Sequence, residues 1–175
     1  MKILATERLQ LRHLEPGDAA FMLELLNEPA YLQHIGDKGV RTLDQARDFI
    51  AQKMAVSYEK NGYGLYLVEL TQTGAPLGIC GLVKRDGLED IDIGFAFLQQ
   101  FWSKGYAYES ARAIMDYARD TVGLKRIVAI TALDNWSSIG LLEKLGLKFD
   151  KVIQLPGHER GSKFFVKPFT EAKAP

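Results

Sequence analysis

The sequence predicts an α+β fold in which a mostly antiparallel sheet of about seven strands carries helices on both faces. Two observations lead to this expectation. Apolar and polar residues alternate in several short segments, as in half-buried strands, and apolar residues recur every three or four positions in others, as in amphipathic helices. The segments follow the order strand, two helices, three strands, helix, strand, helix, two strands. Strands that follow one another without a helix after each are typical of an α+β sheet.

Seven segments have a strand pattern. In the first, Leu9 and Leu11 alternate with polar residues, and from Gly64 onward the apolar period becomes two. The next three segments are predicted to form an antiparallel meander, and a continuous apolar run after the long helix is expected to be a buried strand. The predicted strands are residues 8–14, 64–70, 76–85, 91–98, 126–133, 147–155 and 163–169.

Four segments have a helical pattern. The first follows the turn Pro16-Gly17-Asp18 and is predicted to end at Asn27-Glu28-Pro29. The others are expected over residues 42–61, 105–121 and 137–145. Thr42 can cap the second helix, and Gly146 suits the C-terminal cap of the last one.

Composition limits the class of protein. A chain of 175 residues favours one domain spanning 1–175. Its 22 basic residues balance 22 acidic ones, so neither nucleic acid nor an anionic membrane is an expected partner. A lone cysteine, Cys80, and an amino terminus without a long apolar stretch favour the cytoplasm, and no run is long enough to span a bilayer.

The segment IDIGFAFLQQFWSKGYAYESARAIMDYA, residues 91–118, carries the strongest functional signal. One face of its strand is predicted to bear Asp92, Gly94, Ala96 and Leu98, and the small residues there leave room for a ligand. The loop then enters a helix, whose free first-turn amides and positive dipole end favour an anion. Loop and helix start are Ser103-Lys104-Gly105-Tyr106-Ala107.

An ordinary strand–helix junction with small packing residues would give the same pattern, so this alternative stays open. Other nucleotide motifs are missing from the sequence: it has no G-x-x-x-x-G-K-[ST] and no G-x-G-x-x-G after a strand. ATP and NAD are therefore disfavoured as ligands.

The loop resembles the pyrophosphate signature of the GNAT superfamily of N-acetyltransferases, Arg/Gln-x-x-Gly-x-Gly/Ala, in the branch similar to ribosomal-protein N-terminal acetyltransferases (RimJ/RimL-like). Trp102 stands at the Arg/Gln position, where that branch often has an aromatic residue. A second block, RIVAITALDNWSSIGLLEKLGLKF, is similar to the family's strand, Asn-x-x-Ser and helix, with Asn135, Ser138 and Gly146 at the matching positions. With Thr6-Glu7-Arg8-Leu9, the resemblance covers nearly the whole chain.

The resemblance implies acetyl-CoA as cosubstrate, lying between the strands at 91–98 and 126–132. It implies that main-chain groups of Phe97 and Leu98 pair with the pantetheine, as an added strand pairs with an edge. The amides of Ser103, Lys104, Gly105, Tyr106 and Ala107 would bind the pyrophosphate. Asn135 would lie near the pantetheine or thioester, although it is equally suited to cap the short helix.

For catalysis the resemblance implies direct attack of an amine on the thioester. Leu142 occupies the place where many GNAT enzymes have an acidic tyrosine, so Ser138 is the candidate acid, unless it is simply a helix N-terminal serine. Asp92 is the candidate base, with Glu89, Asp90 and Glu109 nearby in sequence and a solvated carboxylate cluster as the alternative. No metal is expected, because the three histidines lack ligand spacing.

The sequence leaves two classes of acceptor open, a protein or peptide N-terminus and a small amine. A non-catalytic acyl-CoA sensor is a further alternative. An α-amine with a pKa near 7.7 is roughly 15% neutral at pH 7, against less than about 0.1% for a lysine, so a weakly equipped site suits α-amines. A homodimer is conceivable if an exposed last strand pairs with a copy of itself.

Overall fold

The computed structural model describes residues 1–169, which form one eight-stranded sheet in the order β1-β2-β3-β4-β5-β6-β8-β7. The α+β prediction is confirmed, and the strand it lacked is β1, which pairs with β2. The strands are β1 (Lys2–Ala5), β2 (Leu9–Arg12), β3 (Leu65–Leu70), β4 (Pro76–Lys84), β5 (Ile91–Phe97), β6 (Arg126–Ala132), β7 (Lys148–Leu155) and β8 (His158–Pro168).

Six α-helices lie among the described residues, against four helical segments predicted from the sequence. They are α1 (Ala19–Leu26), α2 (Pro29–His34), α3 (Leu43–Phe49), α4 (Val56–Asn61), α5 (Tyr106–Tyr117) and α6 (Trp136–Lys144). The predicted helix 42–61 is α3 and α4 joined by a π-helical segment, Ile50–Ala55. The first helix ends at Asn27-Glu28-Pro29 as predicted, since α1 stops at Leu26, but Pro29 also begins a further helix, α2, where its missing N–H does no harm.

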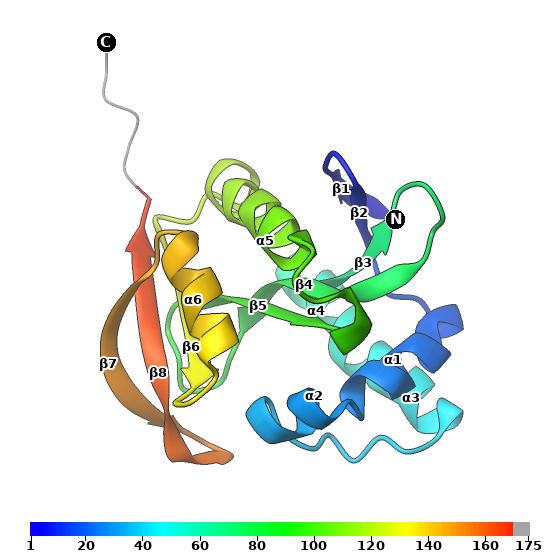
Figure 1. Ribbon diagram of the computed structural model, residues 1–175, viewed down its shortest axis with the longest axis horizontal. Helices are drawn as coiled ribbons and strands as arrows, with labels where there is room; N and C mark the ends of the chain where they lie inside the picture. Colours follow the sequence, from blue (N-terminus) through cyan, green and yellow to red (C-terminus); the bar gives the residue numbers. More distant parts are fainter. Residues whose placement is uncertain (170–175) are drawn as a thin grey trace.

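The helices cover both faces of the sheet (Figure 1). On one face α5 and α6 pack on β5 and β6 through residues such as Ile93, Phe97 and Ile114. On the other face α1 to α4 form a second core that includes Leu98 and Leu26. Phe97 and Leu98 therefore point to opposite faces, as the predicted alternation along β5 requires. In the described part of the chain, no helix is long and apolar enough to cross a bilayer.

The sheet divides between β5 and β6. Strand β5 pairs with β4 in antiparallel register along its whole length, but with β6 it makes one parallel bridge, between Asp92 and Val128. Past this bridge the two strands are no longer paired, so each presents unpaired main-chain groups to the space between them. The split positions the site described below.

The last strand is not exposed, contrary to the expectation from the sequence. Strand β8 lies between β6 and β7 and pairs with both, so the edge of this half of the sheet is β7. On β7, Phe149 and Val152 expose about half of their surface. Self-association through β8, as the sequence suggested, is thereby excluded because both of its edges are occupied.

Candidate active site

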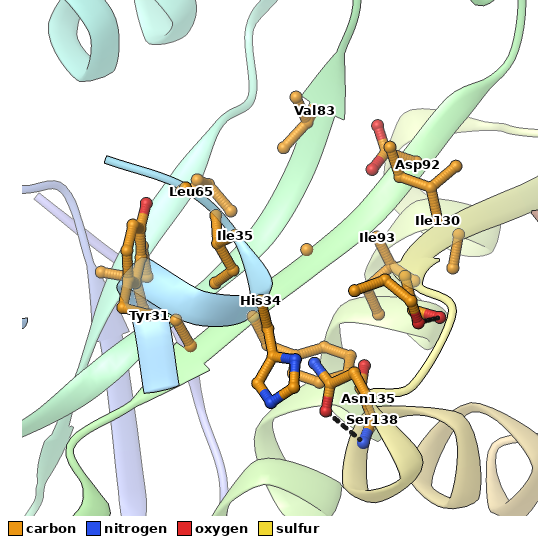
Figure 2. A pocket seen from close by; sticks show the side chains of 18 of the residues that line it. Tyr31, His34, Ile35, Leu65, Val83, Asp92, Ile93, Ile130, Asn135 and Ser138 are labelled. Carbon is orange, nitrogen blue, oxygen red and sulfur yellow. Dashed lines mark hydrogen bonds between the residues drawn. The ribbon is translucent and has the colours of Figure 1, made fainter. Parts of the chain in front are cut away.

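A cavity of about 1350 Å³ occupies the split between β5 and β6 and reaches both faces of the sheet. Residues of α5 and α6 line it on one side, and residues of α2 and the segment after α2 line it on the other. Figure 2 shows Asp92 toward one end of the cavity and Ser138 with Asn135 toward the other. Two ligands could therefore meet inside the sheet from opposite faces.

Most of the residues predicted for the site line this cavity. They are Asp92, Phe97, Ser103, Gly105, Tyr106, Ala107, Asn135 and Ser138. The other two do not: Leu98 points into the core of α1 to α4, and Lys104 is an exposed residue of the loop.

The loop before α5 presents a row of free amides. The first hydrogen bond of this helix runs from the Glu109 amide to the Gly105 carbonyl. Within the described chain, the amides of residues 103–108 therefore donate to no main-chain carbonyl. Ser103 and Gly105 have φ of 62° and 83°, which turns the loop so that successive amides can converge. Convergent amides at a helix N-terminus form an anion site.

Arg8, from the start of β2, holds this loop in place. Its Nη1 donates to the Lys104 carbonyl at 3.0 Å, its Nε donates to Glu109 at 2.8 Å, and its guanidinium lies 4.5 Å from the ring centre of Tyr106. Burial alone would raise the pKa of Glu109, but hydrogen bonds from Thr6 and Arg8 lower it. These partners lie about a hundred residues from Arg8 in the sequence, so no local pattern around Arg8 could have predicted that it positions the loop.

Trp102 fixes the other end of the loop. Its indole Nε1 donates to the Phe97 carbonyl at 2.8 Å, which ties the loop back to the end of β5. This contact explains why an aromatic residue can stand at the first position of the signature.

The main chain of β5 shows which groups are free to pair with a ligand. Both groups of Leu98 are used, because its amide donates to Leu77 and its carbonyl accepts from Phe101, each at 2.9 Å. In an antiparallel ladder alternate residues face the same neighbour. The amides of Phe95 and Phe97 therefore face the split, whereas that of Leu98, predicted to pair with the pantetheine, does not.

At the N-terminus of α6, Asn135 accepts a hydrogen bond from the Ser138 amide at 3.3 Å (dashed in Figure 2). Asn135 is thus the N-cap that one of the two sequence interpretations expected. Ser138 is partly exposed to the cavity, whereas Leu142, one turn further on, is buried in the core. The Ser138 hydroxyl is therefore a polar group that this turn offers to a ligand, beside Ser137, which also lines the cavity.

Asp92 is almost fully buried, with 1% of its surface exposed, and lies 3.1 Å from Nε of Arg85. Burial raises the pKa of the Asp92 carboxyl to about 6, against the opposing effect of Arg85. The neighbouring candidates have other partners: Asp90 pairs with Arg126, and Glu109 pairs with Arg8. Of the carboxylates considered from the sequence, Asp92 is the one that lines the cavity.

His34, at the end of α2, was not a predicted site residue, but it lines the cavity on the side opposite α5. Its Nδ1 is buried without a hydrogen-bond partner in the described chain and lies 3.8 Å from a carboxylate oxygen of Asp134. That separation is too long for a hydrogen bond but brings α2 against the loop before α6. No sequence signal links these two residues, which are a hundred positions apart.

Cys80 is fully buried in the core, and burial raises the pKa of its thiol to about 12. A thiol in that state is a poor nucleophile. Among residues 1–169 no three metal-ligating side chains come together.

A split sheet with free amides at a helix N-terminus defines an enzyme that binds an acyl-CoA and transfers its acyl group. Residues 8–148 match the family model described as an acetyltransferase (GNAT) domain, and the chain belongs to this family. The family assignment made from the loop and the Asn-x-x-Ser block is confirmed. The protein is an acetyl-CoA-dependent N-acetyltransferase, as GNAT acetyltransferases use acetyl-CoA.

Similar proteins differ in what they acetylate. The chain is 31% identical to YkkB of Bacillus subtilis (strain 168) over 156 residues, covering 86% of this chain and 88% of YkkB. It shares its fold with RimL, a ribosomal L7/L12 α-N-protein acetyltransferase solved in complex with coenzyme A (TM-score 0.80, 16% identity, 96% and 98% coverage). It also shares it with a chimera of the spermidine N-acetyltransferase SpeG from Vibrio cholerae and hSSAT (TM-score 0.73, 20% identity, 91% and 95% coverage). The fold alone therefore does not select the acceptor.

Proposed function

We propose that this protein transfers the acetyl group of acetyl-CoA directly to an α-type primary amine. The observation that carries the proposal is the cavity in the split sheet, which meets the free amides of 103–108 on one side and Asp92 on the other. The pyrophosphate binds to the loop amides, and the pantetheine pairs with the amides of Phe95 and Phe97. The acceptor amine enters from the face covered by α1 to α4.

Each chemical step has a candidate group. Asp92 accepts the proton of the incoming ammonium, and the neutral nitrogen then forms a bond with the thioester carbonyl carbon. A strand amide facing the split stabilises the oxyanion that develops. When the C–S bond breaks, the departing thiolate receives a proton from the Ser138 hydroxyl. The nitrogen of the tetrahedral intermediate still carries a surplus proton, which it releases through water to Ser138 as the neutral amide forms. The positive N-terminal end of α6 lowers the energy of that thiolate.

The basicity of Asp92 supports an α-amine as the acceptor. A carboxylate with a pKa near 6 can deprotonate an amine of pKa near 7.7 at small energetic cost, since each unit of difference is worth about 1.4 kcal/mol. A lysine amine would cost about three times more. A peptide N-terminus meets this condition fully. The amine of a free amino acid lies between the two cases, because its own carboxylate stabilises the ammonium and raises its pKa.

An assay of thiol release tests the proposal. Acetyl-CoA is incubated with the protein and, in parallel, with α-amino acids, short peptides, lysine derivatives blocked at the α-amine, and polyamines. We expect acetylated α-amines to form in step with CoA release. Equal or faster acetylation of the blocked lysines would contradict the proposal.

A further inference from the structure

The acceptor side of the cavity has a cationic wall made of Lys38, Lys53 and Arg85. Lys38 lies in the segment after α2, Lys53 lies in the π-helical segment, and Arg85 follows the end of β4. Three elements that are distant in the sequence thus bring positive charge to one chamber.

These charges are only partly neutralised. Arg85 contacts Asp92 through Nε, at 3.2 and 3.1 Å from the two carboxylate oxygens. Within residues 1–169 its Nη1 and Nη2 donate to no side chain or carbonyl, and Lys38 and Lys53 pair with no acid. Although much of Lys38 is accessible to solvent, partial desolvation and the like charges of Arg85 and Lys53 lower the pKa of its ammonium.

The carboxylates nearby do not balance this wall. Glu28 and Glu159 also line the cavity, and the Glu28 carboxylate accepts a hydrogen bond from the Gln99 amide at 3.1 Å. The same lining adds three further cations, Lys60, Lys84 and Arg160, so positive charge still exceeds negative charge. On the opposite side His158 adds no negative charge, and desolvation together with Arg85 and Lys38 lowers its pKa. The charged groups near Lys38 and His158 are thus cations. A polycationic acceptor would be repelled by them.

Two close approaches between loops lie near the acceptor side of the cavity. A β-carbon at Gly87, in the β4–β5 hairpin, would lie 3.8 Å from Cδ of Pro156 in the β7–β8 turn. On another side, the end of α2 approaches the loop before α6 through His34 and Asp134. The acceptor side is thus part of a cavity within the sheet, and such cavities are typical sites for small molecules.

We propose that the acceptor is a small amine bearing an anionic group, a carboxylate or a phosphate, which Arg85, Lys38 and Lys53 bind while Asp92 receives the amine. The inference rests on the proposed function and narrows its acceptor. The free Nη pair of Arg85 matches the two oxygens of a carboxylate or phosphate, and the two lysines add charge without fixed geometry. Because Asp92 and Arg85 are in contact, Asp92 would bind the amine of a zwitterionic acceptor while Arg85 binds its anionic group.

Matched acceptors test this inference. Initial rates are measured for an α-amino acid, its carboxamide, its α-aminophosphonate analogue, a tetrapeptide and spermidine. We expect the amino acid or the aminophosphonate to have a kcat/KM at least tenfold above that of the carboxamide and of spermidine. Comparing the rates of the two anionic acceptors distinguishes a carboxylate subsite from a phosphate subsite. Preference for the carboxamide, the tetrapeptide or spermidine would overturn the inference.

Variants locate the effect. Lys53→Gln and Lys38→Gln are expected to raise KM for the anionic acceptor about tenfold and to change KM for the carboxamide less than twofold. Lys148→Gln, on exposed β7, is the matched control. A KM that stays unchanged in both cavity variants would contradict the assignment of the anion to these lysines.

A binding measurement separates this inference from the proposed function. Calorimetry of the CoA-saturated protein with the N-acetyl amino acid and with its carboxamide requires no turnover. Tighter binding of the acid, lost in Lys53→Gln, supports the subsite even if no acetylation occurs, in which case the proposed function alone fails. Equal binding of acid and carboxamide overturns the subsite, whatever the outcome of the acetylation assay.

Discussion

Arg8 Nη1 donates a hydrogen bond to the carbonyl of Lys104 at 3.0 Å and thereby connects the first hairpin of the sheet to the loop that opens onto the cavity. The same guanidinium bonds Glu109 in the first turn of α5. Loop and helix are thus held together by one side chain from the opposite end of the chain. This contact gives the arrangement of the loop amides a physical cause that no local sequence pattern reveals.

Replacing Arg8 should therefore weaken cofactor binding without removing a ligand-binding amide. Arg8→Lys keeps the charge but cannot donate to the Lys104 carbonyl and to Glu109 at the same time. The loss of one charged hydrogen bond costs about 1.5–3 kcal/mol. We expect Kd for acetyl-CoA, measured by calorimetry, to rise about tenfold or more. Arg112→Lys, on the exposed side of α5, is the control and should leave Kd unchanged. An unchanged Kd in both variants would show that the loop holds its shape without Arg8.

Gly105 offers a test with a well-matched control. Its φ of 83° disfavours a β-carbon by about 1–2 kcal/mol, and that carbon would lie 3.2 Å from Arg8 Nη2. Gly123 has a φ of 82° with nothing within 4 Å of such a carbon. Gly105→Ala and Gly123→Ala should therefore lower stability by similar amounts, but only the first should weaken acetyl-CoA binding. Gly105→Glu should abolish binding, because it adds a negative charge beside the pyrophosphate. If both alanine variants bind acetyl-CoA normally, the pyrophosphate assignment is wrong.

Ser138→Ala tests the proposed acid. Loss of a general acid reduces the rate about 10²-fold or more. Because the Asn135 cap bonds the main-chain amide of Ser138, the helix should be unaffected. We expect kcat to fall and Kd for acetyl-CoA to stay constant, while Glu143→Ala, at an exposed position of the same helix outside the cavity, keeps most of the activity. Unaltered turnover of Ser138→Ala would remove Ser138 from the mechanism.

The raised pKa of Asp92 predicts a pH dependence of activity. If the ionised carboxylate accepts the proton, kcat/KM falls as pH drops below about 6. In Asp92→Asn this acid limb should disappear and the rate at neutral pH should fall about 10²-fold. The change in kcat/KM that is caused by titration of the acceptor amine, with a pKa near 7.7, remains in both proteins. An acid limb near 6 that persists in Asp92→Asn would assign it to another group.

The same shift predicts a stability change whose sign can be checked in the same variant. The carboxyl binds its proton more tightly in the folded protein, where its pKa is about 6, than in the unfolded chain, where it is about 3.9. The free energy of unfolding therefore decreases as pH rises between these two values. Urea unfolding should show this decrease in the wild-type protein and a smaller one in Asp92→Asn.

The sequence anticipated what depends on local pattern. The alternation in β5, the loop before α5 and the cap at Asn135 follow from neighbouring residues and are found in the structure. The missing elements, β1 and α2, are only four and six residues long, and Pro29 suits a helix start as well as a helix stop. Short elements are stabilised mainly by their tertiary neighbours, and a local window does not contain these.

Parts of the site that depend on distant contacts could not be read from the sequence. Arg8 reaches Lys104, His34 approaches Asp134, and Arg85 and Lys38 line one cavity only because the chain folds back across the sheet. The occupation of the Leu98 amide by Leu77 depends on the register of β4 and β5 in the same way. Register and packing, rather than residue type, decide these positions.

The most direct test of the central claim is a thermal-shift titration with acetyl-CoA, CoA, ATP and NAD in parallel. A ligand present at a hundred times its Kd stabilises the folded state by about 2.7 kcal/mol. Free amides at 103–108 with a cavity in the split sheet predict stabilisation by acetyl-CoA and CoA, and none by ATP or NAD at the same concentration. No shift with either CoA compound would contradict the assignment of the loop as a pyrophosphate site.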